Sequence, residues 1–490
     1  MADSEWDVVV VGAGTSGCAL AARLADAGRR VLLLEAGADH ARPADFPPDL
    51  RDAATLGAAV PGHPANWDLA GELTEGLTAR IPRGRVVGGS SALNAGSFIR
   101  ATRADLDGWA AEGNDLWSYD AVLPAFRRLE ADREFGDRPE HGRDGPVPVG
   151  RAREGHPLAD AFAAAAARLG YPEEPDKNSG GTTSGYGPVP LNVADGVRVN
   201  TAMAYLSPRR GLPTLTVRGG VTVRRVVVER GRAAGVETTD GVVRAAEVVL
   251  SAGAVGSPHL LLLSGIGPAD DLRRAGIPVA ADVPGVGAEF SDHPNVYVGY
   301  APAEPLPSPR LPLHGVLHAT ADLPGDLEIL PWLTPFTGAD ERAVGVGLQQ
   351  PQARGRLGLD EDDPTRQPRL AYGYLADESD RRRLRAGVRL TADLLRTASL
   401  ARTGLPDDVL RADRALDDWI RSHLTTAIHL CGTARMGPPS DPGAVVDQEL
   451  RVRGVSGLRV VDTSVLPRVP SRGPAATAVM LGERAAELMT

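Results

Sequence analysis

The fold is decided by one stretch near the start of the chain, Val8-Val-Val-Val11-Gly12-Ala-Gly14-Thr-Ser-Gly17. A run of four valines is typical of a parallel strand that is buried on both faces. The apolar spacing that follows predicts a helix over residues 16–27, and Gly28 is placed to end it. A second strand is predicted over residues 31–34 and is followed by Glu35. The sequence therefore predicts a strand, a glycine-rich turn, a helix and a second strand, with an acid about 20 residues after the glycines.

This arrangement is typical of a dinucleotide site. Gly12, Gly14 and Gly17 let the backbone turn tightly and let a pyrophosphate approach the helix N-terminus, where free N–H groups and the helix dipole favour negative charge. Glu35 is placed to accept hydrogen bonds from the adenosine ribose. Because an acid here disfavours a phosphorylated ribose, FAD or NAD is expected rather than NADP. The alternative, a glycine-rich turn without a ligand, is disfavoured by the flanking strands and by Glu35.

Composition limits the remaining classes of function. The 490 residues include 53 Lys and Arg against 63 Asp and Glu, and a net charge of −10 gives no general reason to bind nucleic acid. Cys18 and Cys431 have no ligand-spaced neighbours, so neither a disulfide nor a metal site is expected. No apolar run approaches the ~18 residues of a membrane span, and the acidic start of the chain does not resemble a secretory signal. We therefore expect a cytoplasmic protein without a transmembrane segment.

The rest of the chain predicts further elements. A Gly/Ser-rich stretch between Pro82 and Arg100 is predicted as a loop that enters a helix. Ser257, followed by Pro258, is predicted as the N-cap of another helix. Residues 301–368 are rich in proline, and their pattern says least. The other predicted elements are helices over 158–169, 377–398 and 476–488, β-rich segments over 222–229 and 236–250 with a turn at Asp240-Gly241, and a strand over 458–461.

Several motifs, taken in their order along the chain, resemble those of one enzyme family. They are the first stretch with Leu32-Leu-Leu-Glu35-Ala-Gly37, then Arg83-Gly-Arg-Val-Val-Gly88-Gly-Ser-Ser-Ala-Leu-Asn94, Gly253-Ala-Val-Gly-Ser-Pro258, Ser291-Asp-His-Pro294, His429-Leu-Cys-Gly-Thr433 and Val460-Val-Asp462. Together they resemble the cofactor fingerprint and signature motifs of the glucose-methanol-choline (GMC) flavoprotein family over nearly the whole chain. A series of motifs in the right order is more specific than any one of them.

The resemblance implies a mixed α/β fold, in which a Rossmann-like FAD-binding domain is interleaved with a substrate domain of a sheet and helices. The FAD-binding segments would be 1–155, 192–295 and 425–490, and the substrate-binding segments 156–191 and 296–424. The residues implied to hold FAD are Gly12, Gly14, Thr15, Ser16, Gly17, Glu35, Ala36, Trp67, Arg83, Val87, Gly88, Gly89, Ser90, Asn94, Gly96, Ser97, Val223, Ala252, Gly253, Asp462 and Thr477.

The resemblance also bears on how FAD is held. Family members that attach FAD covalently do so through a histidine at the position of Leu93, so non-covalent FAD is expected here. A nicotinamide enzyme with the same fingerprint is the competing interpretation. It gives no role to the stretch from Gly88 to Asn94.

The family's common reaction is the oxidation of an alcohol, in which a base takes the hydroxyl proton while a hydride leaves the carbinol carbon for the flavin. His429 matches the family's catalytic histidine, and a neutral imidazole with a usual pKa of ~6.5 suits this task. The alternative is a structural histidine in a loop. A structural role is the default for the histidines without a motif, and it is also expected for His293 in its motif: the former are His40, His63, His141, His156, His314, His318 and His423.

The second catalytic position departs from the family pattern. Most members have a histidine or asparagine before the final helix, where this chain has Ala475, or Gly473 if the loop is shifted by two residues. Neither side chain can exchange a proton. In finer detail, Ser471-Arg-Gly-Pro and other short motifs resemble the GMC dehydrogenases associated with the redox cofactor mycofactocin, in which the position of Ala475 holds a histidine.

Three functions remain open at this point. The first is an FAD-dependent alcohol dehydrogenase or oxidase that passes electrons to oxygen or to a respiratory or redox-cofactor acceptor. The second is a lyase on the same scaffold, which keeps FAD without cycling it. The third is a flavin-binding protein that has lost catalysis, an interpretation motivated by Ala475. The substrate is not predicted, because the region expected to line its pocket has the fewest motifs.

Overall fold

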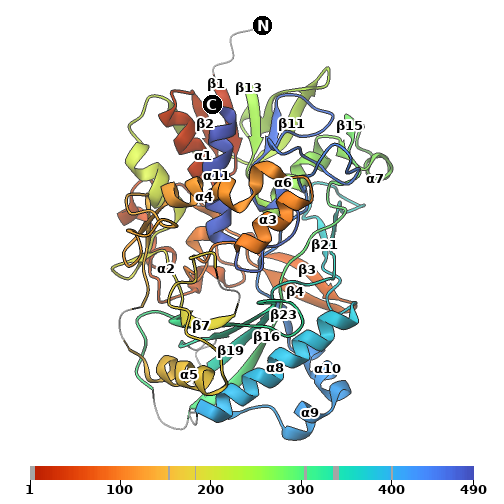
Figure 1. Cartoon of the computed structure of the whole chain (residues 1–490). Coiled ribbons are helices and arrows are strands. Elements are labelled where there is room, and N and C mark those ends of the chain that lie inside the picture. Colours follow the sequence, from red (N-terminus) through yellow and green to blue (C-terminus); the bar gives the residue numbers. More distant parts are fainter. Residues whose placement is uncertain (1–5, 153–154, 182–183, 303–305, 335–341, 399–400) are drawn as a thin grey trace.

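The computed structural model describes residues 6–152, 155–181, 184–302, 306–334, 342–398 and 401–490. Its framework consists of two seven-stranded sheets. In Figure 1 the sheet that contains β1, β2 and β13 lies toward the end that holds the C-terminus, and the sheet with β7, β16 and β19 lies toward the opposite end. The mixed α/β class predicted from the sequence is confirmed.

The first sheet is built around β1 (Trp6–Val11). This strand pairs in parallel with β2 (Val31–Leu34) on one side and with β13 (Gly241–Leu250) on the other. Val8, Val9 and Val10 have no exposed surface, which confirms a strand buried on both faces. The sheet order is β10-β2-β1-β13-β12-β11 with β24 paired to β13, the further strands being β10 (Leu215–Arg218), β11 (Val223–Glu229), β12 (Arg232–Thr238) and β24 (Leu458–Val460).

Two helices from opposite ends of the sequence lie side by side against this sheet, α1 (Thr15–Asp26) and α11 (Ala475–Met489). They pack so closely that a Cβ on Gly482 would lie 2.4 Å from the backbone oxygen of Ser16. The fully buried carboxylate of Glu483 ties α11 to its surroundings. It binds Arg23 of α1 at 2.9 Å, Arg128 of α4 (Tyr119–Leu129) at 2.7 Å and the Tyr205 hydroxyl at 2.6 Å.

The second sheet has the order β22-β16-β19-β18-β17-β7, with β23 paired to β16. One of its faces is covered by the long helix α8 (Glu378–Ala398). The close approach is seen at Gly387, where a Cβ would lie 2.7 Å from Val346 and 3.2 Å from Leu327. The opposite face is therefore free to take part in a site. The strands are β7 (Gly185–Pro188), β16 (Pro294–Pro302), β17 (Gly315–Ala319), β18 (Leu327–Pro331), β19 (Arg342–Leu348), β22 (Ala401–Thr403) and β23 (Leu424–Thr426).

The remaining elements are shorter and connect or flank the two sheets. The helices are α2 (Pro48–Arg51), α3 (Arg103–Ala111), α4 (Tyr119–Leu129), α5 (Pro157–Arg168), α6 (Gly253–Leu263), α7 (Ala269–Arg274), α9 (Asp407–Arg411) and α10 (Asp413–Ser422). The strands are β3 (Leu69–Thr74), β4 (Leu77–Ile81), β5 (Glu130–Asp132), β6 (Val147–Val149), β8 (Val193–Ala194), β9 (Val197–Arg198), β14 (Ile266–Gly267), β15 (Ala281–Asp282), β20 (Arg356–Gly358) and β21 (Arg369–Ala371). Helices α5, α8 and α11 match predicted helices to within one residue at either end.

The prediction of Ser257 as a helix N-cap is wrong. Helix α6 begins at Gly253, and Pro258 lies inside it. A proline inside a helix leaves the carbonyl four residues earlier without its partner. Here that carbonyl belongs to Ala254, and it accepts a hydrogen bond of 2.6 Å from the Thr433 hydroxyl. A residue far along the chain thus lets the helix start one turn early.

The β-rich stretch also differs from its prediction. The segment predicted over 236–250 holds the end of β12, a turn and β13, so three antiparallel strands stand where two segments were expected. The additional turn lies at Arg230-Gly231, where the backbone φ angles are +52° and +73°. Glycine adopts this left-handed conformation readily, but arginine does so only in a turn that the paired strands enforce.

Candidate active site

The glycine-rich turn between β1 and α1 is packed too closely for side chains. A Cβ on Gly12 would lie 2.5 Å from the Ser251 backbone oxygen, and one on Gly17 would lie 2.1 Å from the Gly12 oxygen. Gly12 also has a φ of +98°. These two glycines bring α1 close to the end of β1 and to β13, as the fingerprint requires. Gly14 differs, because a Cβ there would be 3.7 Å from its nearest neighbour.

The N-termini of α1 and α11 converge on this turn. Neither helix has an acidic residue in its first turn, and among the described residues no side chain caps either of them. The Ser16 hydroxyl donates a hydrogen bond of 2.6 Å to the Ala478 oxygen and fixes the two first turns together. Two helix ends with unpaired N–H groups and positive dipole ends therefore meet at one place. Such a cradle fits an anionic dinucleotide such as FAD.

The N-terminus of α6, in contrast, is closed by a side chain of the protein. Asp462 accepts hydrogen bonds from the Gly253 backbone at 2.9 Å and from the Ser257 hydroxyl at 2.5 Å. Its other oxygen accepts one from Ser464 at 2.9 Å. The carboxylate of Asp462, expected near the cofactor, thus serves the helix, and any contact of Asp462, Ala252 or Gly253 with FAD stays a prediction.

Glu35 is held at the end of β2 by the backbone around it. Its two carboxylate oxygens accept hydrogen bonds from Ala13 at 3.0 Å and from Gly37 at 2.9 Å. Burial raises its pKa to about 7, although these backbone hydrogen bonds act in the opposite direction. Each oxygen retains a further lone pair, so Glu35 can still accept a hydrogen bond from a ribose hydroxyl.

The predicted cofactor loop lies directly on the glycine-rich turn. The Gly88 backbone donates 2.7 Å to the Ala13 oxygen, and a Cβ on Gly89 would lie 2.6 Å from the Gly14 Cα. Gly88 and Gly89 both have left-handed backbones, with φ of +107° and +54°. The loop is held further by Ser90, whose hydroxyl accepts from Gly84, and by Asn94, whose side chain accepts from Gly96.

The other predicted cofactor residues are spread around this core. Trp67 is 44% exposed and lies under the Arg85 guanidinium at 4.9 Å. The Thr477 hydroxyl, in the first turn of α11, accepts a hydrogen bond of 3.3 Å from Ala101. Val223 begins β11, and Ser97 bridges to Leu191. Of the rest, Thr15 begins α1, Ala36 follows Glu35, and Val87 is buried with its N–H bonded to Ala38.

His429 meets another histidine across the chain. Its Nδ1 lies 2.9 Å from Nδ1 of His293, whose Nε2 lies 3.0 Å from the Pro470 carbonyl oxygen. Because a carbonyl only accepts, His293 carries its proton on Nε2, and its Nδ1 is then the acceptor. His429 must therefore carry its own proton on Nδ1. The remaining nitrogen, Nε2 of His429, then carries a lone pair that accepts no hydrogen bond from the described residues.

Asp292 fixes both histidines through the backbone. One of its oxygens accepts the N–H of His293 and that of His429, each at 2.7 Å, and the other accepts the Thr426 hydroxyl at 2.8 Å. Burial raises the pKa of Asp292 to about 6. The sequence assigned His293 to the architecture alone, whereas the structure gives it a direct contact with His429.

The surroundings keep His429 neutral. Burial, reinforced by the positive charge of Arg83, lowers its pKa to about 3. Arg83 is held in place by a hydrogen bond of 2.9 Å to the Ile428 oxygen. Burial and the neighbouring His429 also lower the pKa of His293 well below its ordinary value. Both imidazoles are thus uncharged at neutral pH.

Of the two positions weighed for a second catalytic group, the structure puts Gly473 next to the imidazole. A Cβ on Gly473 would lie 3.3 Å from both Cε1 and Nε2 of His429. Ala475 is the first residue of α11 and is half-buried. The space in front of Nε2 is therefore bordered by a residue without a side chain.

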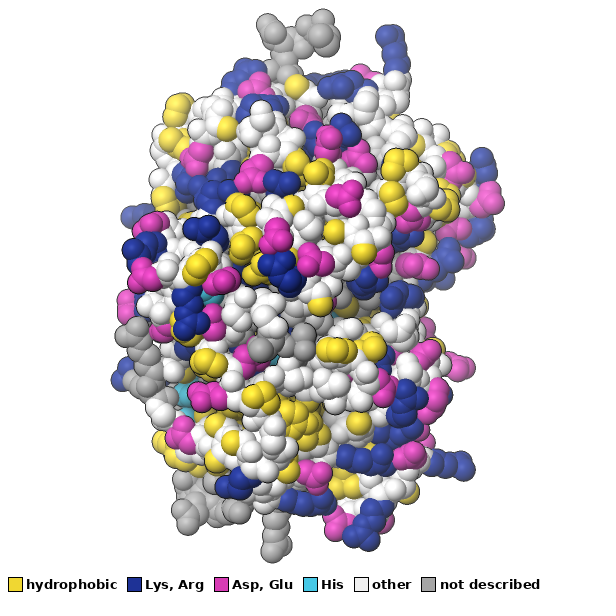
Figure 2. All heavy atoms as spheres, in the orientation of Figure 1, with side chains coloured by type: hydrophobic (Ala, Val, Ile, Leu, Met, Phe, Trp, Pro, Cys, Tyr) yellow, Lys and Arg dark blue, Asp and Glu magenta, His cyan; other side chains and the backbone are white. Residues whose placement is uncertain are grey.

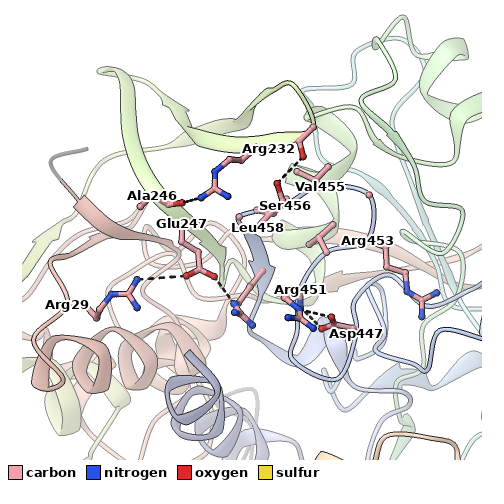
Figure 3. A pocket seen from close by; sticks show the side chains of 15 residues that line it. Arg29, Arg232, Ala246, Glu247, Asp447, Arg451, Arg453, Val455, Ser456 and Leu458 are labelled. Atoms are coloured by element: carbon pink, nitrogen blue, oxygen red, sulfur yellow. Dashed lines mark hydrogen bonds and ion pairs between the residues drawn. The ribbon is translucent and has the colours of Figure 1, made fainter. Parts of the chain in front are cut away.

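A large open groove lies away from this site. It has a volume of about 840 Å³ and is lined by residues of β12, β13 and the chain around β24 (Figure 3). It lies at the start of β24, whereas Asp462 follows the end of that strand. Its arginines are engaged: Arg459 binds Glu247 at 2.7 Å, and Arg451 binds Asp447 at 2.7 Å. The groove is thus at the opposite edge of the sheet from the glycine-rich turn.

The distribution of charge on the surface and the hydropathy of the helices were compared with what a charged binding face or a membrane span would need. Figure 2 shows acidic and basic side chains interspersed over the visible face, in keeping with the many ion pairs that engage the arginines. Among the helices of the described residues, none is both long and apolar enough to cross a membrane.

Comparisons with known proteins point to one family. Residues 6–295 match the N-terminal family model of GMC oxidoreductases, and residues 351–482 match the C-terminal one. A GMC-type oxidoreductase of Rhodococcus erythropolis is 42% identical over 99% of this chain and 98% of its own. The mitochondrial choline dehydrogenase of Homo sapiens is 35% identical over 99% of this chain and 90% of its own. Among solved structures, pyridoxine 4-oxidase from Mesorbium loti is 33% identical with a TM-score of 0.90, covering 99% of both chains.

Proposed function

The chain belongs to the GMC oxidoreductase family, whose members bind FAD, and we propose that it oxidises the CH–OH group of an alcohol with His429 as the base. The observation that carries this proposal is the neutral His429 imidazole, with its Nδ1 proton held by His293 and its Nε2 lone pair without a partner among the described residues. A neutral nitrogen acceptor beside an open position is what proton removal from an alcohol requires. The relatives include choline dehydrogenases and a fungal aryl-alcohol oxidase, the latter 26% identical with a TM-score of 0.85, covering 100% of this chain and 99% of its own.

The chain's own residues would hold the protons of both rings in place and leave one nitrogen of His429 to act. The Pro470 oxygen holds the His293 proton on Nε2, and His293 in turn holds the His429 proton on Nδ1. His429 then accepts the hydroxyl proton of the substrate at Nε2. Asp292 accepts both backbone N–H groups and so holds the two chain segments together, while the hydrogen bonds of the ring nitrogens fix how the rings are turned.

The residues that would hold FAD fit its charge. The first turns of α1 and α11 would face its anionic parts and Glu35 would bind its ribose, and the loop from Gly88 to Ser97 lies over the glycine-rich turn. Bound FAD would supply the hydride acceptor. We include in this proposal the division into FAD-binding segments 1–155, 192–295 and 425–490 and substrate-binding segments 156–191 and 296–424. β23, at the boundary, pairs with the second sheet.

Attachment of FAD is tested separately. Because Leu93 offers no nucleophile, acid precipitation should release all yellow flavin into the supernatant. Flavin that stays with the precipitate would contradict non-covalent binding.

The function is tested by anaerobic mixing of the flavin-loaded protein with a panel of alcohols. Bleaching of the oxidised flavin band, followed by recovery of one aldehyde or ketone per flavin, is the expected result. Product formation with the flavin always oxidised would favour the lyase instead. No bleaching by any alcohol would favour a protein that has lost catalysis, for which the specific observation is that neither Gly473 nor Ala475 offers a side chain that can exchange a proton.

The electron acceptor belongs to the same proposal. The short motifs that resemble mycofactocin-associated dehydrogenases favour a respiratory or redox-cofactor acceptor of that kind over oxygen. Air readmitted after anaerobic reduction separates the two, because slow reoxidation of the flavin is expected of a dehydrogenase. Reoxidation within the time of one turnover would identify an oxidase.

A further inference from the structure

His429 stands in an arch between two paired segments of the second sheet. β23 pairs with β16 as far as Thr426, and the pairing of the two segments resumes at Cys431 (Figure 1). Between these points the segment that leads into β16 has two residues, 292–293, whereas the other has four, 427–430. The extra residues have no place in the ladder, so the longer segment arches outward. Such bulges redirect side chains and are frequent beside active sites.

The arch contains a strained backbone at Ile428. Its φ angle is +66°, which lies in the left-handed region. A β-branched side chain crowds its own backbone in this region, so the conformation persists only where the surroundings enforce it. Of the described non-glycine residues with a positive φ, Ile428 is the only β-branched one; the others are Asp68, Asp195, Arg230, Leu375 and Leu450.

Hydrogen bonds hold both peptide groups of Ile428. Its N–H donates 2.9 Å to the Thr426 hydroxyl, and its carbonyl oxygen accepts 2.9 Å from Nη1 of Arg83. The Thr426 hydroxyl in turn donates 2.8 Å to one oxygen of Asp292, whose other oxygen accepts the N–H of His429 at 2.7 Å. Two successive N–H groups of the arch are thus tied to one carboxylate, the first through Thr426 and the second directly.

Thr426 is the link between the strained residue and this carboxylate. It is only 4% exposed, so its hydroxyl is shielded from water. A hydroxyl has one proton to donate and two lone pairs with which to accept, which matches its donation to Asp292 and its acceptance from Ile428. Valine has the same shape without the hydroxyl. It would leave a buried N–H and a carboxylate oxygen each short of a partner.

The side chain of Ile428 restricts the arch further. It is half-buried and packs against the hydrophobic core. Glycine would adopt a φ of this sign without strain, but it would also adopt many other conformations. A β-branched residue that is held on both sides has few alternatives. The imidazole of His429, which is itself half-buried, therefore projects from a fixed point of the backbone.

We propose that Ile428 and Thr426 are positioning residues for the proton transfer, because the strained backbone that they hold aims the imidazole of His429 out of the strand and toward the substrate hydroxyl. The inference rests on the proposed role of His429 as the base. The ring contact with His293 sets how the imidazole is turned, whereas the arch sets where it stands. Both residues then act on kcat and not on KM.

The first test removes the hydroxyl of Thr426. In FAD-loaded Thr426→Val, the rate of anaerobic flavin reduction by an alcohol should fall about 10- to 100-fold with little change in KM, because a small displacement of a catalytic group is costly. Thr426→Ser keeps the hydroxyl and should recover most of the rate. Flavin content and the urea midpoint are measured alongside, since a variant that only unfolds loses flavin together with activity.

The second test releases the strain at Ile428. Ile428→Gly should keep FAD and lower kcat by about tenfold or more, whereas Ile428→Val, which is also β-branched, should stay near the wild type. Arg230 supplies the matched control. It is left-handed too, with a φ of +52°, but it lies in an exposed turn away from the arch. Arg230→Gly should therefore leave kcat unchanged.

A third measurement does not depend on turnover. Nitrogen-15 spectra of the histidine-labelled, FAD-loaded protein report the tautomer of each imidazole, and the signals of His429 are identified by their absence in His429→Asn. In the wild type they should show a proton fixed on Nδ1. In Thr426→Val and in Ile428→Gly they should broaden or shift toward a mixture of tautomers, because a displaced ring loses its contact with His293.

The outcomes separate the two proposals. Altered His429 signals in both variants of a protein that no alcohol bleaches would support the arch while contradicting alcohol oxidation. Wild-type rates and spectra in Thr426→Val and Ile428→Gly would overturn the inference. So would a fall in rate that Thr426→Ser does not recover, or one that lost flavin explains completely in both variants.

Discussion

Two histidine clusters in this protein use the same side chain in opposite ways. His141 has carboxylates at both ring nitrogens, Glu130 at 2.8 Å and Asp176 at 3.0 Å. Burial lowers its pKa, but the hydrogen bonds to Asp176 and Glu130 outweigh that effect and raise it to about 9. His429, in contrast, bonds through its ring to His293 and to no carboxylate of the described chain. Its pKa is lowered to about 3.

The two clusters differ in the groups that their carboxylates bind. In the first cluster they bind the imidazole, and the guanidinium groups of Arg100 and Arg151 complete a balance of three acids and three bases. Arg100 pairs with Glu130 and Arg151 with Asp132, so two of the three groups that could hold a metal ion together with His141 are engaged by cations of the protein itself. In the second cluster Asp292 binds backbone N–H groups instead. A histidine bound by acids is a structural cation, whereas one bound by a neutral acceptor stays a base.

The largest effect is expected from a variant that removes the imidazole of His429 from the second cluster. His429→Asn should lower the rate of anaerobic flavin reduction by about 10²–10⁴, the usual value of a general base. FAD should stay bound, because its predicted contacts lie elsewhere. Stopped-flow absorbance measures the rate, and flavin content per protein is the control. A loss of less than fivefold would show that another group takes the proton.

The next largest effect is a loss of stability, expected from a variant that removes the imidazole of His141 from the first cluster. His141→Gln removes a cation from among three buried acids, and removing one partner of a buried ion pair costs about 3–5 kcal/mol. Urea unfolding should show this loss in the free energy of unfolding, while the rate of flavin reduction per bound flavin stays unchanged. A parallel loss of rate at full flavin content would mean that the two clusters are coupled.

The pH dependence of stability tests whether His141 is charged, in contrast to the neutral His429. The folded pKa of His141 is about 9 and its ordinary value is 6.5, so its stabilisation is complete below pH 6.5 and is lost as the pH rises to 9. The wild type should lose stability across this window, and His141→Gln should show a flatter profile. Identical profiles for the two proteins would contradict a charged His141.

A smaller effect is expected from the partner of the base. His293→Phe removes the acceptor that keeps the His429 proton on Nδ1, and such supporting partners are typically worth about 10- to 100-fold. The loss should fall on kcat rather than KM, and the pH dependence of flavin reduction should shift, since His429 can then adopt either tautomer. An unchanged pH dependence, with a loss of flavin content that matches the loss of kcat, would assign His293 a structural role only.

The features that the sequence predicted depend on residues close together in the chain, whereas the features that it missed depend on contacts between residues far apart in the chain. The unit from Val8 to Glu35 was predicted because its strands, turn and helix depend on neighbouring residues. The early start of α6 was missed, because its cap Asp462 lies 209 residues from Gly253. Likewise, the contact of His293 with His429 spans 136 residues.

The smallest effect expected is a gain. Ala475→His would add a neutral hydrogen-bonding group at the start of α11, where the helix dipole disfavours a charged imidazole. If the alcohol oxygen lacks a second partner beside His429, flavin reduction should rise severalfold in this variant. Ala475→Leu, similar in bulk but without a hydrogen bond, is the matched control and should not gain. Gly473 is the less suitable place, because a Cβ there would already lie 3.3 Å from Nε2 of His429. An unchanged or lower rate in Ala475→His would show that one neutral histidine suffices, and that the contrast between the clusters lies in the partners of the ring alone.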